Sequence, residues 1–153
     1  MEVAIKKLAA MRVAFMRHVG PYTQVGETWN RLCGWAGPRG ILGPHSKMLG
    51  LSHDDPDVTP PDKLRYDACV TVGANVEAEG EIGIQEIPDG EYAMTLHEGP
   101  YENLGGTYAA LCGQWLPQSG RELRSAPAIE VYLNSPFDTK PDDLRTEVYL
   151  PLA

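Results

Sequence analysis

Two short segments near the C-terminus carry an acidic and a phenolic side chain at alternating positions. Glu130 and Tyr132 form the first pair, and Glu147 and Tyr149 form the second. Successive side chains of a β-strand point to opposite faces, so each strand is predicted to place its pair on one face. If the two strands are neighbours, this face presents two carboxylates interleaved with two phenols, while the aliphatic face covers the helices. Carboxylates among aromatic rings bind organic cations, and a carboxylate can also act as a general base.

Two interpretations of this face remain open. Glutamate and tyrosine are ordinary residues on the solvated face of an antiparallel sheet that is covered on one side only. Tyrosine is also well suited to stacking on planar or cationic ligands, which favours a binding groove.

Three further aromatic residues are candidates for the walls of such a groove. Tyr108 and Trp115 lie on the apolar stripe of a predicted helix, where plain core packing is the alternative. Trp35 lies off the stripe of another predicted helix, which indicates a position nearer to the edge of a cavity.

The histidines and cysteines form no catalytic or metal-binding pattern. His18 and His97 both precede Gly-Pro-Tyr and are expected to bond to the backbone at that turn. Three cysteines are an odd number without zinc-site spacing, which favours free thiols in a reducing cytoplasm. Cys69 has no designated base. Since phosphate-loop, dinucleotide and nucleophile-elbow motifs are also missing, we predict neither a metal nor a cofactor.

The chain contains two copies of one sequence pattern. His18–Tyr22 recurs as His97–Tyr101, which is 97 − 18 = 79 residues later, and Leu32–Gly34 recurs as Leu111–Gly113. A Pro/Asp turn that begins at Pro56 recurs at Pro136, with an offset of 136 − 56 = 80. The copies, about residues 1–73 and about residues 81–153, are predicted to form one domain with pseudo-twofold symmetry.

Each copy is predicted to contain a strand, a helix and two further strands. The first copy comprises Val3–Arg17 with a bend near Ala9–Ala10, Thr23–Ala36, Lys47–His53 and Arg65–Val72. The second comprises Glu91–His97, Glu102–Leu116 (a helix stopped by Pro117 and Gly120), Ala128–Asn134 and Arg145–Leu150, after a short linker strand at Ile82–Ile87. These elements predict an α+β fold of duplicated β-α-β-β units, with one antiparallel sheet and two main helices packed on one face of it.

The two copies differ where the polar pairs lie. With the offset of 136 − 56 = 80, the counterparts of Glu130, Tyr132, Glu147 and Tyr149 are Gly50, Ser52, Asp67 and Cys69. One copy thus supplies bulky acidic and aromatic groups and the other mostly small ones, a combination that makes a groove with walls and room. Asp67 is the acidic candidate of the first copy.

The composition limits the kind of partner. A net charge of −8 argues against a nucleic-acid-binding face and is compatible with a cationic partner. No window approaches the roughly 20 apolar residues of a membrane span. A homodimer is compatible with this composition.

Four segments in the same order resemble the GyrI-like small-molecule-binding family, which includes the effector-binding domains of AraC-type and multidrug-sensing activators and the stand-alone DNA gyrase inhibitory proteins. These segments are Arg17–Tyr22, Asp55–Asp67, Ile129–Asn134 and Leu144–Pro151. The resemblance implies a duplicated β-α-β-β architecture with a central groove. In the family's multidrug sensors a strand glutamate meets lipophilic cations among aromatic rings, and Glu130 and Glu147 match that pattern. We expect no counterpart of the DNA-binding half that the activators carry.

Three functional hypotheses follow. The leading one is a binding module for hydrophobic, often cationic or planar compounds. The second, implied by stand-alone members that hydrolyse cyclopropane-containing toxins, makes Glu147 or Glu130 catalytic. The third is an interaction with a protein such as gyrase. The predicted ligand-binding residues are Glu130, Tyr132, Glu147, Tyr149, Asp67, Trp115, Tyr108 and Trp35.

Overall fold

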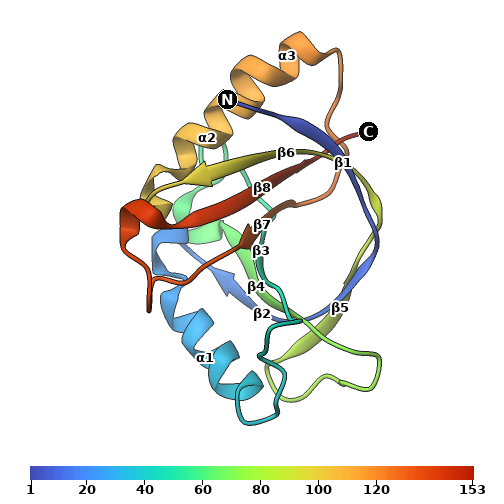
Figure 1. Cartoon of the computed structure of the whole chain (residues 1–153), viewed down its shortest axis with the longest axis vertical. Coiled ribbons are helices and arrows are strands. Elements are labelled where there is room, and N and C mark those ends of the chain that lie inside the picture. The colour runs from blue at the N-terminus through green and yellow to red at the C-terminus, as the bar shows by residue number, and fades with distance from the viewer. The chain divides into compact units, whose positions relative to one another are not determined.

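A computed structural model describes residues 1–153 and divides them into two compact units (Figure 1). The first unit is Ala9–Asp89, and the second unit is Met1–Leu8 together with Gly90–Ala153. Each unit combines four antiparallel strands with helical structure, so the α+β class that was predicted from the sequence is confirmed.

The first unit is built around the helix α1. Its elements are β2 (Met11–Val19), α1 (Gly26–Ala36), β3 (Met48–Ser52), β4 (Arg65–Thr71) and β5 (Gly83–Ile87), with the strand order β3-β4-β2-β5. Leu32 and Ala36 of α1 are fully buried against alternate residues of the sheet, among them Ala68 and Val70. The apolar stripe of the helix therefore covers one face of this sheet, as its spacing predicted.

The second unit repeats this plan with a longer helical segment. Its elements are β6 (Gly90–Glu98), α2 (Leu104–Ala110), a π-helical turn (Leu111–Trp115), α3 (Leu116–Ser119), β7 (Ala128–Tyr132), β8 (Arg145–Pro151) and β1 (Ala4–Leu8), with the strand order β1-β6-β8-β7. Leu104 and Leu111 pack against Ala93, Val148 and Leu150.

The short strand at the start of each repeat joins the other unit: β1 belongs to the second unit, and β5 belongs to the first. The sequence predicted one bent strand over Val3–Arg17, but the chain breaks at Ala9–Ala10 into β1 and β2. β1 pairs with β6, and β5, which precedes β6 in the chain, pairs with β2. The unit boundaries therefore differ from the repeat boundaries that were read from the sequence.

The second helical segment does not stop at Pro117, as was predicted, but continues to Ser119. Proline lacks an N–H and its ring collides with a carbonyl one turn back in a regular α-helix. In the widened turn before it, the Leu116 N–H bonds to the Leu111 carbonyl five residues back, and this π geometry accommodates the proline. Gly120, with a φ of 73°, then ends the segment in the left-handed conformation. None of the helices is long and apolar enough to cross a membrane.

The two Gly-Pro-Tyr motifs form matching turns at the ends of β2 and β6. Nε2 of His18 lies 3.0 Å from the Pro21 carbonyl oxygen, and Nε2 of His97 lies 3.0 Å from the Pro100 carbonyl oxygen. A carbonyl can only accept, so Nε2 donates in both cases. The structural role predicted for the two histidines is confirmed.

Candidate functional site

The register between β7 and β8 separates the two acidic pairs. Glu130 lies opposite Val148, whereas Glu147 lies opposite Val131. Residues that face each other across an antiparallel ladder point to the same side of the sheet. Glu130 and Tyr132 therefore share the helix-facing side with Val148, and Glu147 and Tyr149 lie on the opposite side. The prediction that all four side chains share one face is wrong.

The interpretation of a solvated face fails for a different reason, because β7 is buried on both faces. Ile129 is 0% exposed and Glu130 is 7% exposed, although they are adjacent and point in opposite directions. A strand that is covered on both sides has no solvated face, so alternation alone cannot assign the polar residues to it. The solvated interpretation is consequently wrong for Glu130.

Glu130 lies at the centre of an acidic tyrosine cluster, formed by Glu130, Tyr101, Tyr108 and Tyr132. Tyr108 of α2 donates a hydrogen bond to Oε2 at 2.7 Å, and Tyr132 donates one to Oε1 at 2.9 Å. The ring of Tyr101 packs edge-on against Tyr132, with 5.5 Å between the centroids. Burial raises the pKa of Tyr101, and the charge of Glu130 raises it further.

Two members of this cluster come from the helical side and two from the sheet. Tyr101 begins the short turn before α2, where the repeated Gly-Pro-Tyr motif places it. The motif was predicted to be structural and Tyr101 was not predicted as a site residue, although the repetition of the motif was the available signal. Charge-assisted hydrogen bonds such as those from Tyr108 and Tyr132 contribute roughly 1.5–3 kcal/mol each. They offset part of the cost of removing the Glu130 carboxylate from water.

The corresponding place in the first unit holds a phenol instead of an acid. Tyr66 of β4 lies over Gly50, and a Cβ atom at Gly50 would overlap the Tyr66 hydroxyl. Trp29 of α1 donates to that hydroxyl at 3.1 Å. Trp29 and Gly50 are the repeat counterparts of Tyr108 and Glu130, so both units keep a hydrogen bond from the helix at this place.

Glu147 and Tyr149 form a smaller pair on the other face of the second unit. The Tyr149 hydroxyl donates to Glu147 Oε1 at 3.1 Å. Burial, together with the charge of Glu147, raises the pKa of Tyr149 to about 12, so the phenol stays protonated and remains a donor. The ring of Tyr149 packs edge-on against Tyr92 at 6.1 Å.

Asp67 is fully buried within an ion-pair network of the first unit. It accepts hydrogen bonds from Arg17 Nε (2.8 Å), Arg17 Nη2 (3.0 Å), His53 Nε2 (2.8 Å) and Gln85 Nε2 (3.0 Å). Burial acts to raise the pKa of Asp67, but hydrogen bonds from His53, Arg17 and Gln85 outweigh it and hold this pKa well below its usual range. These donors stabilise the charge of the buried carboxylate, and none of the three partners was predicted from the sequence.

The whole chain, residues 1–153, matches the family model of the GyrI-like small molecule binding domain. The chain belongs to this family. Among curated relatives, the probable transcriptional regulator YgiV of Escherichia coli strain K12 is 33% identical over 110 residues, which cover 71% of this chain and 68% of YgiV.

Solved structures with a similar fold have lower sequence identity. The C-terminal domain of EcmrR is 22% identical and superposes with a TM-score of 0.80, covering 99% of this chain and 97% of that domain. SAV2435, whose structure was solved bound to tetraphenylphosphonium, is 18% identical with a TM-score of 0.66, covering 100% of this chain and 94% of SAV2435.

The two predicted tryptophans of this GyrI-like domain have other contacts. Trp35 Nε1 donates to Glu79 Oε2 at 3.3 Å, and the Arg39 guanidinium lies 4.9 Å from a Trp35 ring centroid while it pairs with Glu79. These contacts attach the end of α1 to the segment before β5. Trp115 packs against the core of the second unit. No hydrogen bond joins either residue to the acidic tyrosine cluster, so their predicted roles at the site are not supported by a contact.

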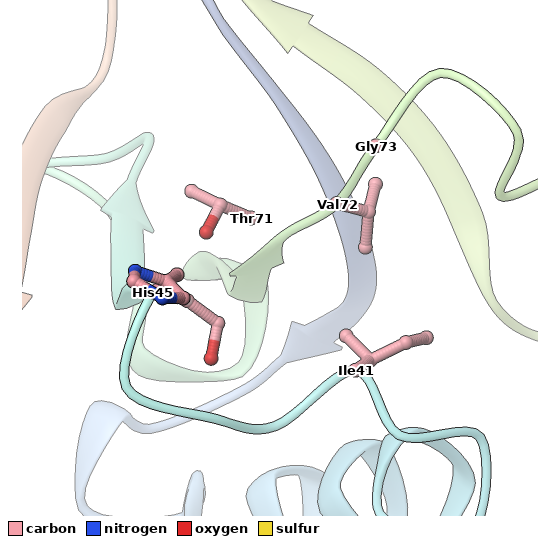
Figure 2. Close-up of a pocket in the computed structure, with 6 residues that line it drawn as sticks. Ile41, His45, Thr71, Val72 and Gly73 are labelled. Carbon is pink, nitrogen blue, oxygen red and sulfur yellow. The ribbon is translucent and has the colours of Figure 1, made fainter.

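A pocket of about 290 Å³ lies on the first unit of the GyrI-like domain, between the loop after α1 and the end of β4 (Figure 2). Figure 2 shows Ile41 and Val72 on one side of it, and His45 and Thr71 on the other. Thr71 Oγ1 already accepts a hydrogen bond from the Lys47 N–H at 2.8 Å. None of the residues predicted to bind a ligand lines this pocket.

Proposed function

We propose that this GyrI-like domain binds lipophilic organic cations, with Glu130 as the counter-charge. The observation that carries the proposal is a carboxylate that is only 7% exposed and that accepts hydrogen bonds from two phenols. Three tyrosine rings gather beside this buried negative charge within one unit.

The physics of such a cluster favours a cation over a neutral compound of the same shape. A buried carboxylate is poorly solvated, so a positive charge beside it recovers electrostatic energy that water would otherwise supply. Tyrosine faces add cation–π attraction, which contributes about 0.5–2 kcal/mol, and the rings add dispersion contacts with apolar substituents. The preferred ligands are therefore bulky, delocalised or quaternary cations.

Two comparisons support this proposal. The first is the match to the family, which is one of small-molecule-binding domains. The second is the similarity in fold to SAV2435, which was solved in complex with the lipophilic cation tetraphenylphosphonium. The same chemistry is proposed for Glu130 because its surroundings meet the requirements of such a ligand.

Isothermal titration of the purified protein with tetraphenylphosphonium tests the proposal. Wild type is expected to bind this cation and to bind the neutral triphenylphosphine oxide at least tenfold more weakly, which corresponds to about 1.4 kcal/mol. Glu130→Gln is expected to remove this preference by lowering the affinity for the cation.

Glu147→Gln is the matched control, because it makes the same change on the opposite face of the same sheet. It is expected to keep the preference for the cation. Equal affinity of wild type and Glu130→Gln for tetraphenylphosphonium would contradict the proposal. Incubation with a cyclopropane-containing electrophile, followed by product analysis, distinguishes binding from hydrolysis.

A further inference from the structure

Thr146 carries a fully buried hydroxyl that makes no hydrogen bond. The residue is 0% exposed, and its Oγ1 atom has no partner. Buried hydroxyls are nearly always hydrogen-bonded, because leaving one unpaired in the interior carries a free-energy penalty. An exception of this kind requires an explanation.

Thr146 belongs to the same side of the sheet as Glu130. Thr146 lies opposite Tyr132 in the β7–β8 ladder, and Glu130 lies opposite Val148, two residues further along β8. Glu130 and Thr146 are therefore diagonal neighbours, and such positions lie roughly 7–8 Å apart on one face. The hydroxyl is thus a neighbour of the acidic tyrosine cluster.

The first unit carries a different hydroxyl at the equivalent position. The counterpart of Thr146 is Tyr66, whose hydroxyl receives the hydrogen bond from Trp29. In the second unit a phenol lies on the adjacent strand instead, at Tyr132. The ring of Tyr132 packs against Tyr101, and in the first unit the ring of Tyr66 packs against Tyr22. Packing alone would allow an apolar residue at position 146, such as valine, which has nearly the same shape without the hydroxyl.

We propose that the Thr146 hydroxyl is the hydrogen-bonding specificity determinant of the Glu130 site. It contacts a neutral polar group that the ligand carries a few ångströms from its positive charge. The preferred ligands are then organic cations with a hydroxyl or carbonyl group at that spacing, rather than purely hydrocarbon cations. This inference rests on the proposed function, since Glu130 supplies the charge contact.

In this proposal the ligand reaches the Thr146 hydroxyl when the ring of Tyr132, its cross-strand neighbour, turns aside. Thr146 is completely covered, whereas its register partner Tyr132 is partly exposed and is held by its hydrogen bond to Glu130 Oε1. A cation at the Glu130 carboxylate competes with that hydrogen bond. Binding of the charge therefore favours the movement that uncovers the hydroxyl.

The experiment compares two cations that differ by one hydroxyl group. Affinities for phenyltrimethylammonium and 3-hydroxyphenyltrimethylammonium are measured by titration calorimetry, with tetraphenylphosphonium as a cation that has no polar group. Wild type is expected to bind the hydroxylated cation about five- to tenfold more tightly, the effect of one neutral hydrogen bond. Thr146→Val is expected to bring this ratio to about one by lowering the affinity for the hydroxylated cation.

Thr146→Ser serves as the conservative control, because it keeps the hydroxyl and should keep the ratio. Thermal unfolding provides a second readout, in which Thr146→Val is at least as stable as wild type because an unpaired buried hydroxyl has been removed. A ratio near one in wild type, or an unchanged ratio in Thr146→Val, would overturn this inference and leave the proposed function intact. Failure of all three cations to bind wild type would overturn both.

Discussion

The two units of this protein keep their buried carboxylates on different sides of equivalent sheets. In the first unit Asp67 lies on the face away from α1, where Arg17, His53 and Gln85 donate to it. In the second unit Glu130 lies on the face toward α2, among tyrosines. The first arrangement stabilises the fold, and the second is the one for which we propose a positively charged ligand.

The difference arises from a few substitutions within one shared plan. On the helix-facing side, Gly50 and Tyr66 of the first unit are replaced by Glu130 and Thr146 in the second. The large side chain is Tyr66 on β4 in the first unit and Glu130 on β7 in the second. In both units the helix donates a hydrogen bond to that side chain. A duplicated fold can thus acquire an acidic site without a change in its backbone plan.

The largest effect is expected from breaking the first-unit network. Asp67→Ala leaves Arg17 and His53 without their buried acceptor and should lower the free energy of unfolding by about 3–5 kcal/mol. Chemical denaturation measures this change. Glu147→Ala at the equivalent position of the second unit removes one hydrogen bond only and should cost about 1 kcal/mol. Equal losses for the two variants would show that the units do not differ in this way.

The same network makes stability depend on pH in the acidic range. The pKa of Asp67 is depressed in the folded protein, so its contribution is fully present above the unfolded value of about 3.9 and is lost as the pH falls below it. Denaturation midpoints between about pH 5 and pH 2 should fall more steeply for wild type than for Asp67→Asn. Parallel curves would indicate that Asp67 is not the group responsible.

The close approach of Tyr66 to Gly50 gives a test of the first-unit cluster. Gly50→Ala introduces a Cβ atom that overlaps the Tyr66 hydroxyl and should destabilise the fold by about 1–3 kcal/mol. Gly105→Ala, in α2, meets no heavy atom within 4 Å and should be neutral or slightly stabilising. A neutral Gly50→Ala would contradict the tight packing described here.

The comparison of the two units also predicts a double substitution that removes the Glu130 site and keeps the fold. The double variant Glu130→Gly/Thr146→Tyr copies the residues of the first unit and should fold, with an affinity for tetraphenylphosphonium at least tenfold lower, or about 1.4 kcal/mol. Thr146→Tyr alone should be less stable than the double variant, because Glu130 then occupies the space that the new ring needs. The reverse order of stabilities would show that the two units are not interchangeable at this place.

The smallest effect concerns the pair on the opposite face of the second unit. Tyr149→Phe removes the hydrogen bond to Glu147 and should cost about 0.5–1.5 kcal/mol of stability. Calorimetric titration should show no change in the affinity for tetraphenylphosphonium. A marked loss of affinity would indicate that the cation binds near Glu147 instead of Glu130.

Several features of the site could be predicted from particular residues. The alternation in β7 placed Glu130 and Tyr132 together, and the stripe of the second helix included Tyr108, which does contact Glu130. The grouping of Glu147 with Glu130 failed because the relation between two strands depends on their register. Tyr101 was not predicted, because its contact with Tyr132 joins residues that are 31 positions apart, since 132 − 101 = 31.

Local sequence patterns specify the duplicated α+β plan, the positions of the main helices and strands, and the turns at the two Gly-Pro-Tyr motifs. These features depend on local spacing and on the conformational preferences of glycine and proline. The folded structure was needed to show which carboxylate lies among tyrosines, which one lies in an ion-pair network, and which units β1 and β5 join. Strand pairing and burial on both faces bring together residues that are distant along the chain, and no local pattern encodes those contacts.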